Sequence, residues 1–257
     1  MTPTAASLLV TVRRGAPRLA SLPAELAPSS LGDAYAVQRA VFTALGERIG
    51  GWKATLFDAS HGICAPIAGT ALWSSPAQVS PASTPTRGTR RFGIEPEIAF
   101  RLGTDLPPLP GELRYSEQQV WAAVESAHAA IEVVVSRYID SDAVTQLERV
   151  ADNFMNEGLV LGPATPNWSE LPMTALPLQV LIDGVPVHQG VGGHPVGSPL
   201  LPLLWIANHL SQLGTGLARG AVITTGSCNG VRYLAPGQSV QAAFTGLGSA
   251  QLNLIED

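Results

Sequence analysis

The chain has 257 residues, a mass of 26.8 kDa and a formal net charge of −5. Apolar residues make up 46 % of it and charged residues only 14 %, against about 25 % charged residues in typical globular chains. This composition excludes general disorder, and an acidic chain without basic runs argues against nucleic acid as the main partner.

Four further features concern partners and location. No window approaches the roughly 18 apolar residues of a membrane span. Arg13 and Arg14 follow the first short apolar stretch, whereas a secretory signal places its basic residues before that stretch. Cys64 and Cys228 are distant thiols, which predicts a reduced, cytoplasmic protein. A surface so poor in charge also predicts that copies of the chain associate into a homo-oligomer.

Residues 1–50 have the pattern of helices. Ser30 and Asp33 have the spacing of a capping box, and apolar residues then recur at helical spacing. These residues are Ala34, Val37, Val41, Leu45 and Ile49. We expect Gly50-Gly51 to end the run. Residues 75–90 contain three prolines and no core pattern, and we interpret them as a connection.

Beyond residue 91, extended segments dominate. The expected strands are 92–102, 130–135, 159–161, 176–182, 185–188, 221–225, 239–244 and 250–255. Asp183-Gly184 has the composition of a type I′ hairpin turn. Two helices interrupt the strands, at 117–128 after a Ser116/Gln119 capping box, and at 199–213 with Ser198 as N-cap and Gly214 as the stop. The chain therefore predicts an α+β or mostly-β main domain (80–257) behind a small helical cap (1–75).

The basic residues are strongly biased toward arginine, with one exception. Fourteen of the fifteen are arginine, and Lys53 is the only lysine, in an apolar, strand-like setting. An ammonium group changes its pKa readily when it is desolvated, whereas a guanidinium group does not release its proton. Chance is one interpretation of the exception. The other is a buried amine that handles protons or binds an anion.

Two glutamates share one face of the expected strand 92–102. Period-two alternation places Glu95 and Glu97 on the same side, about 7 Å apart, with small residues beside them. Two carboxylates this close repel each other unless a cation or a proton lies between them. An ordinary solvated strand face is the alternative. Pro96 between them predicts an edge strand or an irregular one.

A third glutamate lies in a second strand. Glu132 interrupts a run otherwise apolar enough to be buried, and a buried carboxylate is costly unless it is paired or binds a metal. An ion pair with Arg137 or with another arginine is one solution. The other is a site of Glu95, Glu97 and Glu132, whose hard oxygen ligands suit Mg²⁺ or Mn²⁺ and not zinc.

These residues, in this order, resemble the 2-keto-4-pentenoate hydratase branch of the fumarylacetoacetate hydrolase family. The blocks that carry the resemblance are 33–38, Gly51-Trp52-Lys53, Glu95-Pro96-Glu97, 130–137, Asp152-Asn153, 205–210, Thr225-Gly226-Ser227 and Pro236-Gly237. It covers roughly residues 30–255. It implies the family's mixed β-sheet roll or sandwich as the main domain.

The resemblance also implies an activity and a site. Glu95, Glu97 and Glu132 hold a divalent metal, usually Mg²⁺, which chelates a small 2-oxo or 2-hydroxydienoate acid. Lys53 lies beside them as an acid/base or as an anchor for the substrate carboxylate, and Thr225 and Gly226 line the pocket. The implied reaction is the addition of water to a 2-hydroxy-2,4-dienoate in aromatic-compound catabolism. A desolvated pocket and a nearby cation lower the pKa of Lys53, and the three carboxylates oppose that fall.

The chain departs from the family pattern in two places. Ile67 stands where relatives commonly carry an aspartate proposed as an acid/base, and Phe154-Met155-Asn156-Glu157 replaces a small residue followed by serines. His61 and Glu157 are candidate replacements for the missing acid/base, although surface positions are the simpler interpretation of both. Besides the hydratase, two alternatives stay open. They are a decarboxylase, tautomerase or hydrolase using the same enolate chemistry, and a catalytically silent partner subunit.

Overall fold

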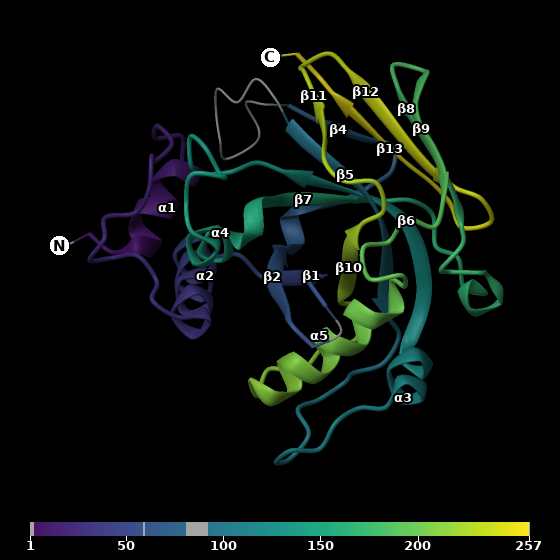
Figure 1. The fold of residues 1–257 in the computed structure, drawn as a ribbon, viewed down its shortest axis with the longest axis horizontal. Coiled ribbons are helices and arrows are strands. Elements are labelled where there is room, and N and C mark those ends of the chain that lie inside the picture. The colour runs from purple at the N-terminus through teal and green to yellow at the C-terminus, as the bar shows by residue number, and fades with distance from the viewer. Residues whose placement is uncertain (1–2, 59, 81–91, 257) are drawn as a thin grey trace.

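The computed structural model describes residues 3–58, 60–80 and 92–256, which form two β-sheets with helices at their margins (Figure 1). The larger sheet has eight strands in the order β2-β1-β10-β5-β6-β7-β3, with β11 pairing with β5. Their bounds are β1 Ile49–Leu56, β2 Gly62–Ala68, β3 Leu72–Ser74, β5 Phe92–Leu102, β6 Val124–Val134, β7 Asn156–Leu161, β10 Val222–Ser227 and β11 Arg232–Leu234. Two strand pairs of this sheet, β1–β10 and β3–β7, are parallel and the others antiparallel, so the predicted α+β class with a mixed sheet is confirmed.

The smaller sheet has the strand order β4-β13-β12-β8-β9. Its strands are β4 Ala77–Val79, β8 Pro177–Ile182, β9 Val185–Val191, β12 Ser239–Phe244 and β13 Gly248–Leu254. The α-helices are α1 Ala5–Arg13, α2 Leu31–Leu45, α3 Glu117–Ala122, α4 Gln146–Ala151 and α5 Leu200–Gln212. Short 3₁₀ turns are η1 Gly69–Ala71, η2 Asn153–Met155 and η3 Trp168–Glu170. Among the described residues, no helix is long and apolar enough to cross a membrane.

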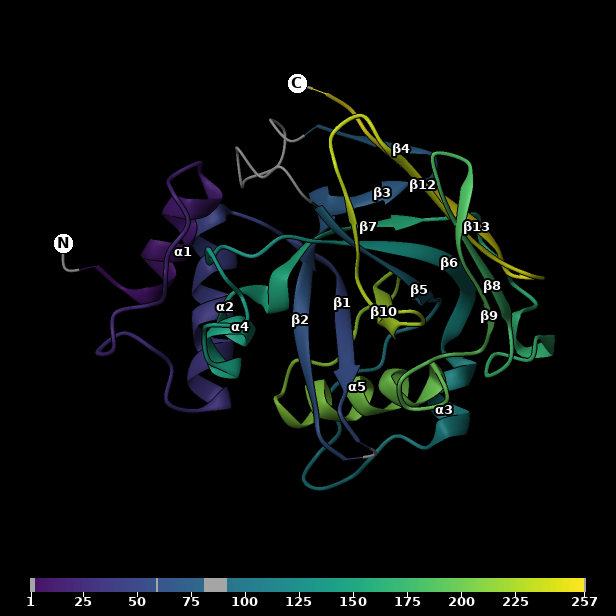
Figure 2. The same ribbon diagram turned by 45° about the horizontal axis from the view of Figure 1, so that its top comes forward.

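The larger sheet is strongly curled, so one of its faces becomes an interior (Figure 2). That interior holds its own buried apolar cluster, formed by Ile67, Ala99, Ala130, Leu159, Leu161 and Val222. The opposite face of β5 carries Phe92, Ile94, Ile98 and Phe100 into the main core, which the smaller sheet completes from β12 and β13. Alternate side chains of β5 therefore enter two different apolar cores, one on each face of the sheet.

The amino-terminal segment differs from the expectation in where its helices end. Helix α2 ends at Leu45, because Gly46 adopts a left-handed conformation with φ 70° and caps the helix. The predicted stop at Gly50-Gly51 is wrong, since both glycines belong to β1. Within 75–90, Ala77–Val79 forms β4 and pairs with β13, and residues 81–90 lie outside the described part. That 1–75 and 80–257 are separate domains stays a prediction.

The expected helix 117–128 is only half correct. The Ser116 capping box is present, but the helix ends at Ala122 and β6 begins at Val124. Residues 124–128 pair instead with β5, since Ser126 lies opposite Arg101 and His128 opposite Ala99. Strand pairing has overridden the local helical pattern. The later helix begins at Leu200 rather than residue 199, and the Asp183-Gly184 turn is confirmed by φ angles of 49° and 76°.

Gly51 permits the closest approach between β1 and β10. A Cβ at this position meets the carbonyl oxygen of Val222 at 2.5 Å. We predict that Gly51→Ala lowers the free energy of unfolding by about 1–3 kcal/mol, because the two backbones must separate. The matched control is Gly32→Ala in α2, whose nearest atom is 3.7 Å away and which should change stability by at most about 1 kcal/mol. Urea unfolding compares the two, and equal effects contradict the prediction.

Candidate metal centre and active site

Strands β5 and β6 bring the three predicted glutamates together. Glu95 and Glu132 are direct partners across the two strands, and Glu97 lies two residues along β5 on the same face. One oxygen from each of the three carboxylates lies within 4.8 Å of the others. Glu97 and Glu132 are 1 % and 0 % exposed, and Glu95 is partly buried. The alternation argument is thus confirmed, and a solvated strand face is excluded.

Pro96 lies in the centre of the sheet and not at its edge. Strand β5 is bordered by β10 on one side and β6 on the other, so the predicted edge strand is wrong. The predicted irregularity is present, because the register with β10 shifts between Thr224 and Ser227. The Pro96 carbonyl accepts from the Cys228 N–H at 2.9 Å. Proline has no N–H to donate, and the Pro96 nitrogen faces the gap between β10 and β11. The sheet therefore loses no hydrogen bond at this position.

Lys53 enters the same interior from β1. It pairs with Thr224 of β10, which pairs with Ala99 of β5, so its side chain shares a face with the glutamates. Its Nζ lies 2.7 Å from Glu132 Oε1. The ammonium also donates to the Phe154 carbonyl at 3.2 Å and lies 5.2 Å from the centroid of the Phe154 ring. The lone lysine is therefore a buried member of the carboxylate cluster.

The protein fixes some carboxylate oxygens and leaves another without a partner. Glu132 Oε1 accepts from Lys53 and from Asn156 Nδ2 at 2.7 Å, while Oε2 is buried without a partner. Glu97 Oε2 accepts from the Thr224 hydroxyl and from the Gly226 N–H at 2.8 Å. Three carboxylates and one ammonium leave two negative charges. A divalent cation balances that charge and fills the open oxygen position, so the residues present fit such an ion.

The pKa values record the same crowding. Burial, opposed by Lys53 and reinforced by Glu132, raises the pKa of Glu95 from its ordinary 4.5 to about 7. Burial and the two neighbouring carboxylates raise the pKa of Glu97 well above its ordinary value. For Lys53, burial lowers the pKa and the carboxylates raise it, and the result is a raised value. The expected fall in the pKa of Lys53 is therefore not found with the protein's own groups alone.

The remaining candidates have other partners. Arg137 binds Asp152 and, at 2.8 Å, Glu157, so it does not neutralise Glu132. Glu157 is occupied by that pair, which leaves it as a poor acid/base. The His61 side chain is 77 % exposed and pairs with Asp58 at 2.8 Å on the β1–β2 turn. Both therefore have structural roles, and the expected surface position is correct for His61 but wrong for Glu157, which is 6 % exposed.

The predicted pocket residues lie on the strand that supports Glu97. The Gly226 N–H contacts this carboxylate directly. The Thr225 hydroxyl donates to the Ile98 carbonyl at 2.7 Å, so in this structure its neighbour Thr224 carries the hydroxyl that reaches Glu97. Sequence reasoning assigned no contact with the cluster to Thr224, Phe154 or Asn156. Alternation from Gly226 could have found Thr224, while Phe154 and Asn156 were noticed only as a departure from the family pattern.

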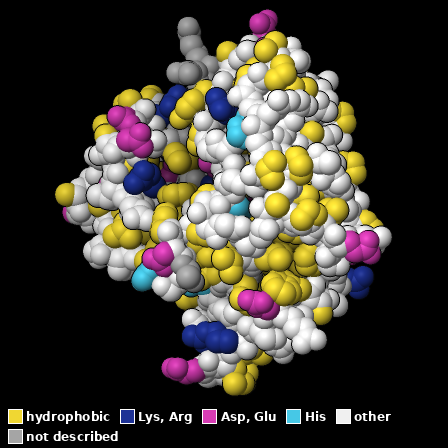
Figure 3. All heavy atoms as spheres, turned by 45° about the vertical axis from the view of Figure 1, so that its right-hand side comes forward, with side chains coloured by type: hydrophobic (Ala, Val, Ile, Leu, Met, Phe, Trp, Pro, Cys, Tyr) yellow, Lys and Arg dark blue, Asp and Glu magenta, His cyan; other side chains and the backbone are white. Residues whose placement is uncertain are grey.

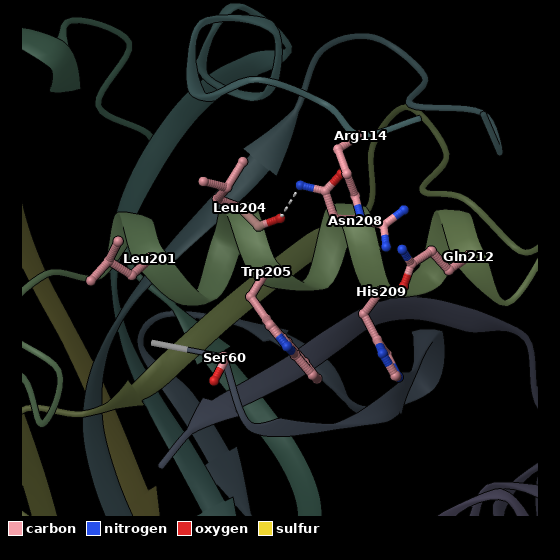
Figure 4. Close-up of a pocket in the computed structure, with 8 residues that line it drawn as sticks. All are labelled: Ser60, Arg114, Leu201, Leu204, Trp205, Asn208, His209 and Gln212. Carbon is pink, nitrogen blue, oxygen red and sulfur yellow. Dashed lines mark hydrogen bonds between the residues drawn. The ribbon is translucent and has the colours of Figure 1, made fainter. Parts of the chain in front are cut away.

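Two surface cavities help to define the site. One, of about 690 Å³, is lined by Val134, Met155, Val231 and Tyr233, among others. Val134 lies two residues beyond Glu132 on the same strand, so this cavity opens on the carboxylate side of the sheet. The other, of about 410 Å³, runs along α5, where Trp205 stacks on His209 (Figure 4). Neither Lys53 nor any of the three glutamates lines either cavity.

Comparison with known proteins identifies the family. The model of the fumarylacetoacetate (FAA) hydrolase C-terminal domain matches residues 67–254. The chain belongs to the fumarylacetoacetate hydrolase family. It is 29 % identical to a 2-keto-4-pentenoate hydratase of Paraburkholderia xenovorans (strain LB400), over 96 % of this chain and 92 % of that protein.

One further relative and one solved structure are also similar to this chain. A 2-hydroxyhexa-2,4-dienoate hydratase of Comamonas testosteroni is 32 % identical over 63 % of this chain and 60 % of that protein. The structure of 4-oxalocrotonate decarboxylase from Pseudomonas putida G7, complexed with magnesium and adipate, has a TM-score of 0.82 at 22 % identity, over 98 % of this chain and 96 % of that one. The structural likeness confirms the predicted fold.

The first prediction from the site concerns metal affinity. Glu97→Gln removes one charged ligand, and we expect Mg²⁺ or Mn²⁺ affinity to fall by more than roughly 100-fold in calorimetric titration. With a chelator present, the variant should be as stable as the wild type or about 1 kcal/mol more stable, since a buried negative charge is lost. Glu125→Gln, an exposed position on β6, is the control. If the wild type, Glu97→Gln and Glu125→Gln bind the metal with equal affinity, the proposed metal site is wrong.

The second prediction concerns pH with a chelator present. Because the pKa of Glu95 is about 7 in the folded protein against an ordinary 4.5, the folded state holds a proton that the unfolded chain releases between these values. Stability should therefore fall as pH rises from about 4.5 to 7. Thermal melts of the wild type and Glu95→Gln isolate the effect, since the glutamine variant lacks this slope. If the melting temperatures of the two proteins change with pH in parallel, the prediction is wrong.

Proposed function

We propose that the protein is a metal-dependent hydro-lyase that adds water to a 2-hydroxy-2,4-dienoate in aromatic-compound catabolism. The observation that carries the proposal is the contact between Lys53 and a buried cluster of three glutamates, inside a fold shared with enzymes of this chemistry. The names of the two hydratase relatives support the same substrate class.

We take the cofactor to be Mg²⁺ or Mn²⁺, held by Glu95, Glu97 and Glu132, because the ligands are oxygen only. Such an ion, when bound, supplies positive charge that stabilises negative charge on the oxygens of a 2-oxo acid. Lys53 then binds the substrate carboxylate or transfers a proton at C3. Glu132 and the Phe154 carbonyl keep its ammonium aimed at the cluster, while Thr225 and Gly226 line the pocket.

One observation favours decarboxylation of a 2-oxo acid as a second candidate. Ile67 is 0 % exposed and packs among Ala99, Ala130 and Leu159 in the interior. Water addition at the far end of a dienoate requires a group that moves a proton there, and this side of the interior is apolar. Loss of CO₂ needs stabilisation of the resulting enolate but no activated water.

The third prediction separates the two reactions. With Mg²⁺, the protein should remove the ultraviolet absorbance of 2-hydroxypenta-2,4-dienoate, while a 2-oxo-3-enedioate reports decarboxylation by release of CO₂. Lys53→Met should lose both activities by at least roughly 100-fold, and Lys53→Arg should keep part of them only if Lys53 is an anchor. We expect Ile67→Asp to shift the balance toward hydration. Full activity of Lys53→Met refutes the mechanism.

We also propose that copies of this chain associate and that the protein works in the cytoplasm. The low charge content and exposed apolar side chains such as Phe57, Leu201 and Leu213 support association. Figure 3 shows hydrophobic side chains spread over one face among few charged ones. The free thiols Cys64 and Cys228 support a reducing compartment.

The fourth prediction tests this association by light scattering at micromolar concentration. Because exposed apolar surface is buried when copies meet, the mass should be a multiple of the 26.8 kDa chain mass. A monomeric mass contradicts association. Replacing Phe57, Leu201 or Leu213 by aspartate, one at a time, then identifies the surface, since a charge inside an interface favours the monomer.

A further inference from the structure

The turn that covers Lys53 has an unusual backbone. Asn153, Phe154 and Met155 have φ angles of 57°, 48° and 65°. Side chains with a Cβ rarely occupy this left-handed region, and three in succession persist only where the surroundings hold them. The conformation of η2 is therefore imposed by its contacts, not by its own sequence.

This turn and the residue after it hold both members of the buried ion pair. The Phe154 carbonyl accepts from Lys53 Nζ, and the Asn156 side chain donates to the Glu132 oxygen that Lys53 also contacts. The Met155 carbonyl accepts from the Val135 N–H at 2.8 Å, which ties the turn to the strand that carries Glu132. A change in the turn therefore moves Lys53 and Glu132 together.

One guanidinium group fastens both ends of the turn. Arg137 is 0 % exposed, and its Nη2 donates to the Asp152 carbonyl at 2.8 Å and to the Asn156 carbonyl at 3.2 Å. Its Nε donates to the Asp152 carboxylate. Its Nη1 donates to Glu157 on the far side, at 2.8 Å. Only a planar fork with several fixed donors makes these contacts at once, so lysine is no substitute.

We propose that Arg137 is a positioning residue: by bridging Asp152 and Asn156, it keeps the 153–155 turn closed and sets where Lys53 and Glu132 lie. It acts through the Phe154 carbonyl and the Asn156 amide, and it pairs with none of the three carboxylates of the cluster. The loss of activity expected from changing Arg137 rests on the proposed function, whereas the opening of the turn does not.

Lys53 is the only lysine, so chemical labelling of its ε-amine shows whether the turn is open without any measurement of activity. In the wild type it is 4 % exposed and should react slowly in reductive methylation followed by mass spectrometry. We expect Arg137→Lys to react at least roughly tenfold faster, since the turn opens locally. Its kcat should fall by roughly 100-fold, with KM changed much less. A guanidinium salt added to Arg137→Ala should restore part of the protection.

Glu157→Gln is the matched control, because it weakens the same guanidinium on the side that does not touch the turn. It should lower the melting temperature but keep the labelling rate and kcat within roughly threefold of the wild type. Equal labelling and kcat in Arg137→Lys and the wild type overturn the proposal. So does a Glu157→Gln protein that behaves like Arg137→Lys, since Arg137 then serves stability alone.

A measurement on the wild type covers the case in which the Arg137 variants do not fold. The Val135 amide, which donates to Met155, should exchange hydrogen only through global unfolding. Exchange by easy local opening overturns the proposal. If Lys53 labelling responds as expected but no form of the protein acts on dienoates or 2-oxo acids, the proposed function fails and the positioning role stands.

Discussion

A buried ammonium facing three carboxylates is the interaction on which the interior of the larger sheet depends. Without Lys53, Glu95, Glu97 and Glu132 would place three negative charges within 4.8 Å of one another in a poorly solvated space. With it, part of that charge is balanced, while burial and the neighbouring carboxylates raise the pKa values of Glu95 and Glu97. The turn at Phe154, the Thr224 hydroxyl and the Gly226 N–H all serve to hold this arrangement.

The interior of the curled sheet mixes charged and apolar side chains. Glu97 lies opposite Ala130 across β5 and β6, and Glu132 lies opposite Leu159 across β6 and β7. Ala130 and Leu159 belong to the apolar cluster of this interior. Such neighbours exclude water, which strengthens the electrostatic interactions among the glutamates and Lys53.

Local periodicity was enough to predict the cluster of three glutamates. Alternation paired Glu95 with Glu97, and a charge inside an apolar run indicated Glu132. The same reasoning failed where long-range pairing decides the outcome, as at residues 124–128, which form strand because β5 lies beside them. The contacts of Phe154 and Asn156 with the cluster could not be predicted, because they depend on the left-handed backbone angles of the 153–155 turn. Arg137, which lies 15 or more residues earlier in the sequence, holds this turn.

The pairing of β1 with β10 has a consequence for synthesis of the protein. Lys53 lies opposite Thr224, and Ala77 of β4 lies opposite Leu252 of β13. At roughly 5–20 residues per second, the ribosome makes the partner of β1 about 10–30 s after β1 itself. During that time one edge of an apolar strand has no neighbour. Thr224 and Gly226, which donate hydrogen bonds to Glu97, are also made late, so the carboxylate cluster is among the last parts to reach its final arrangement.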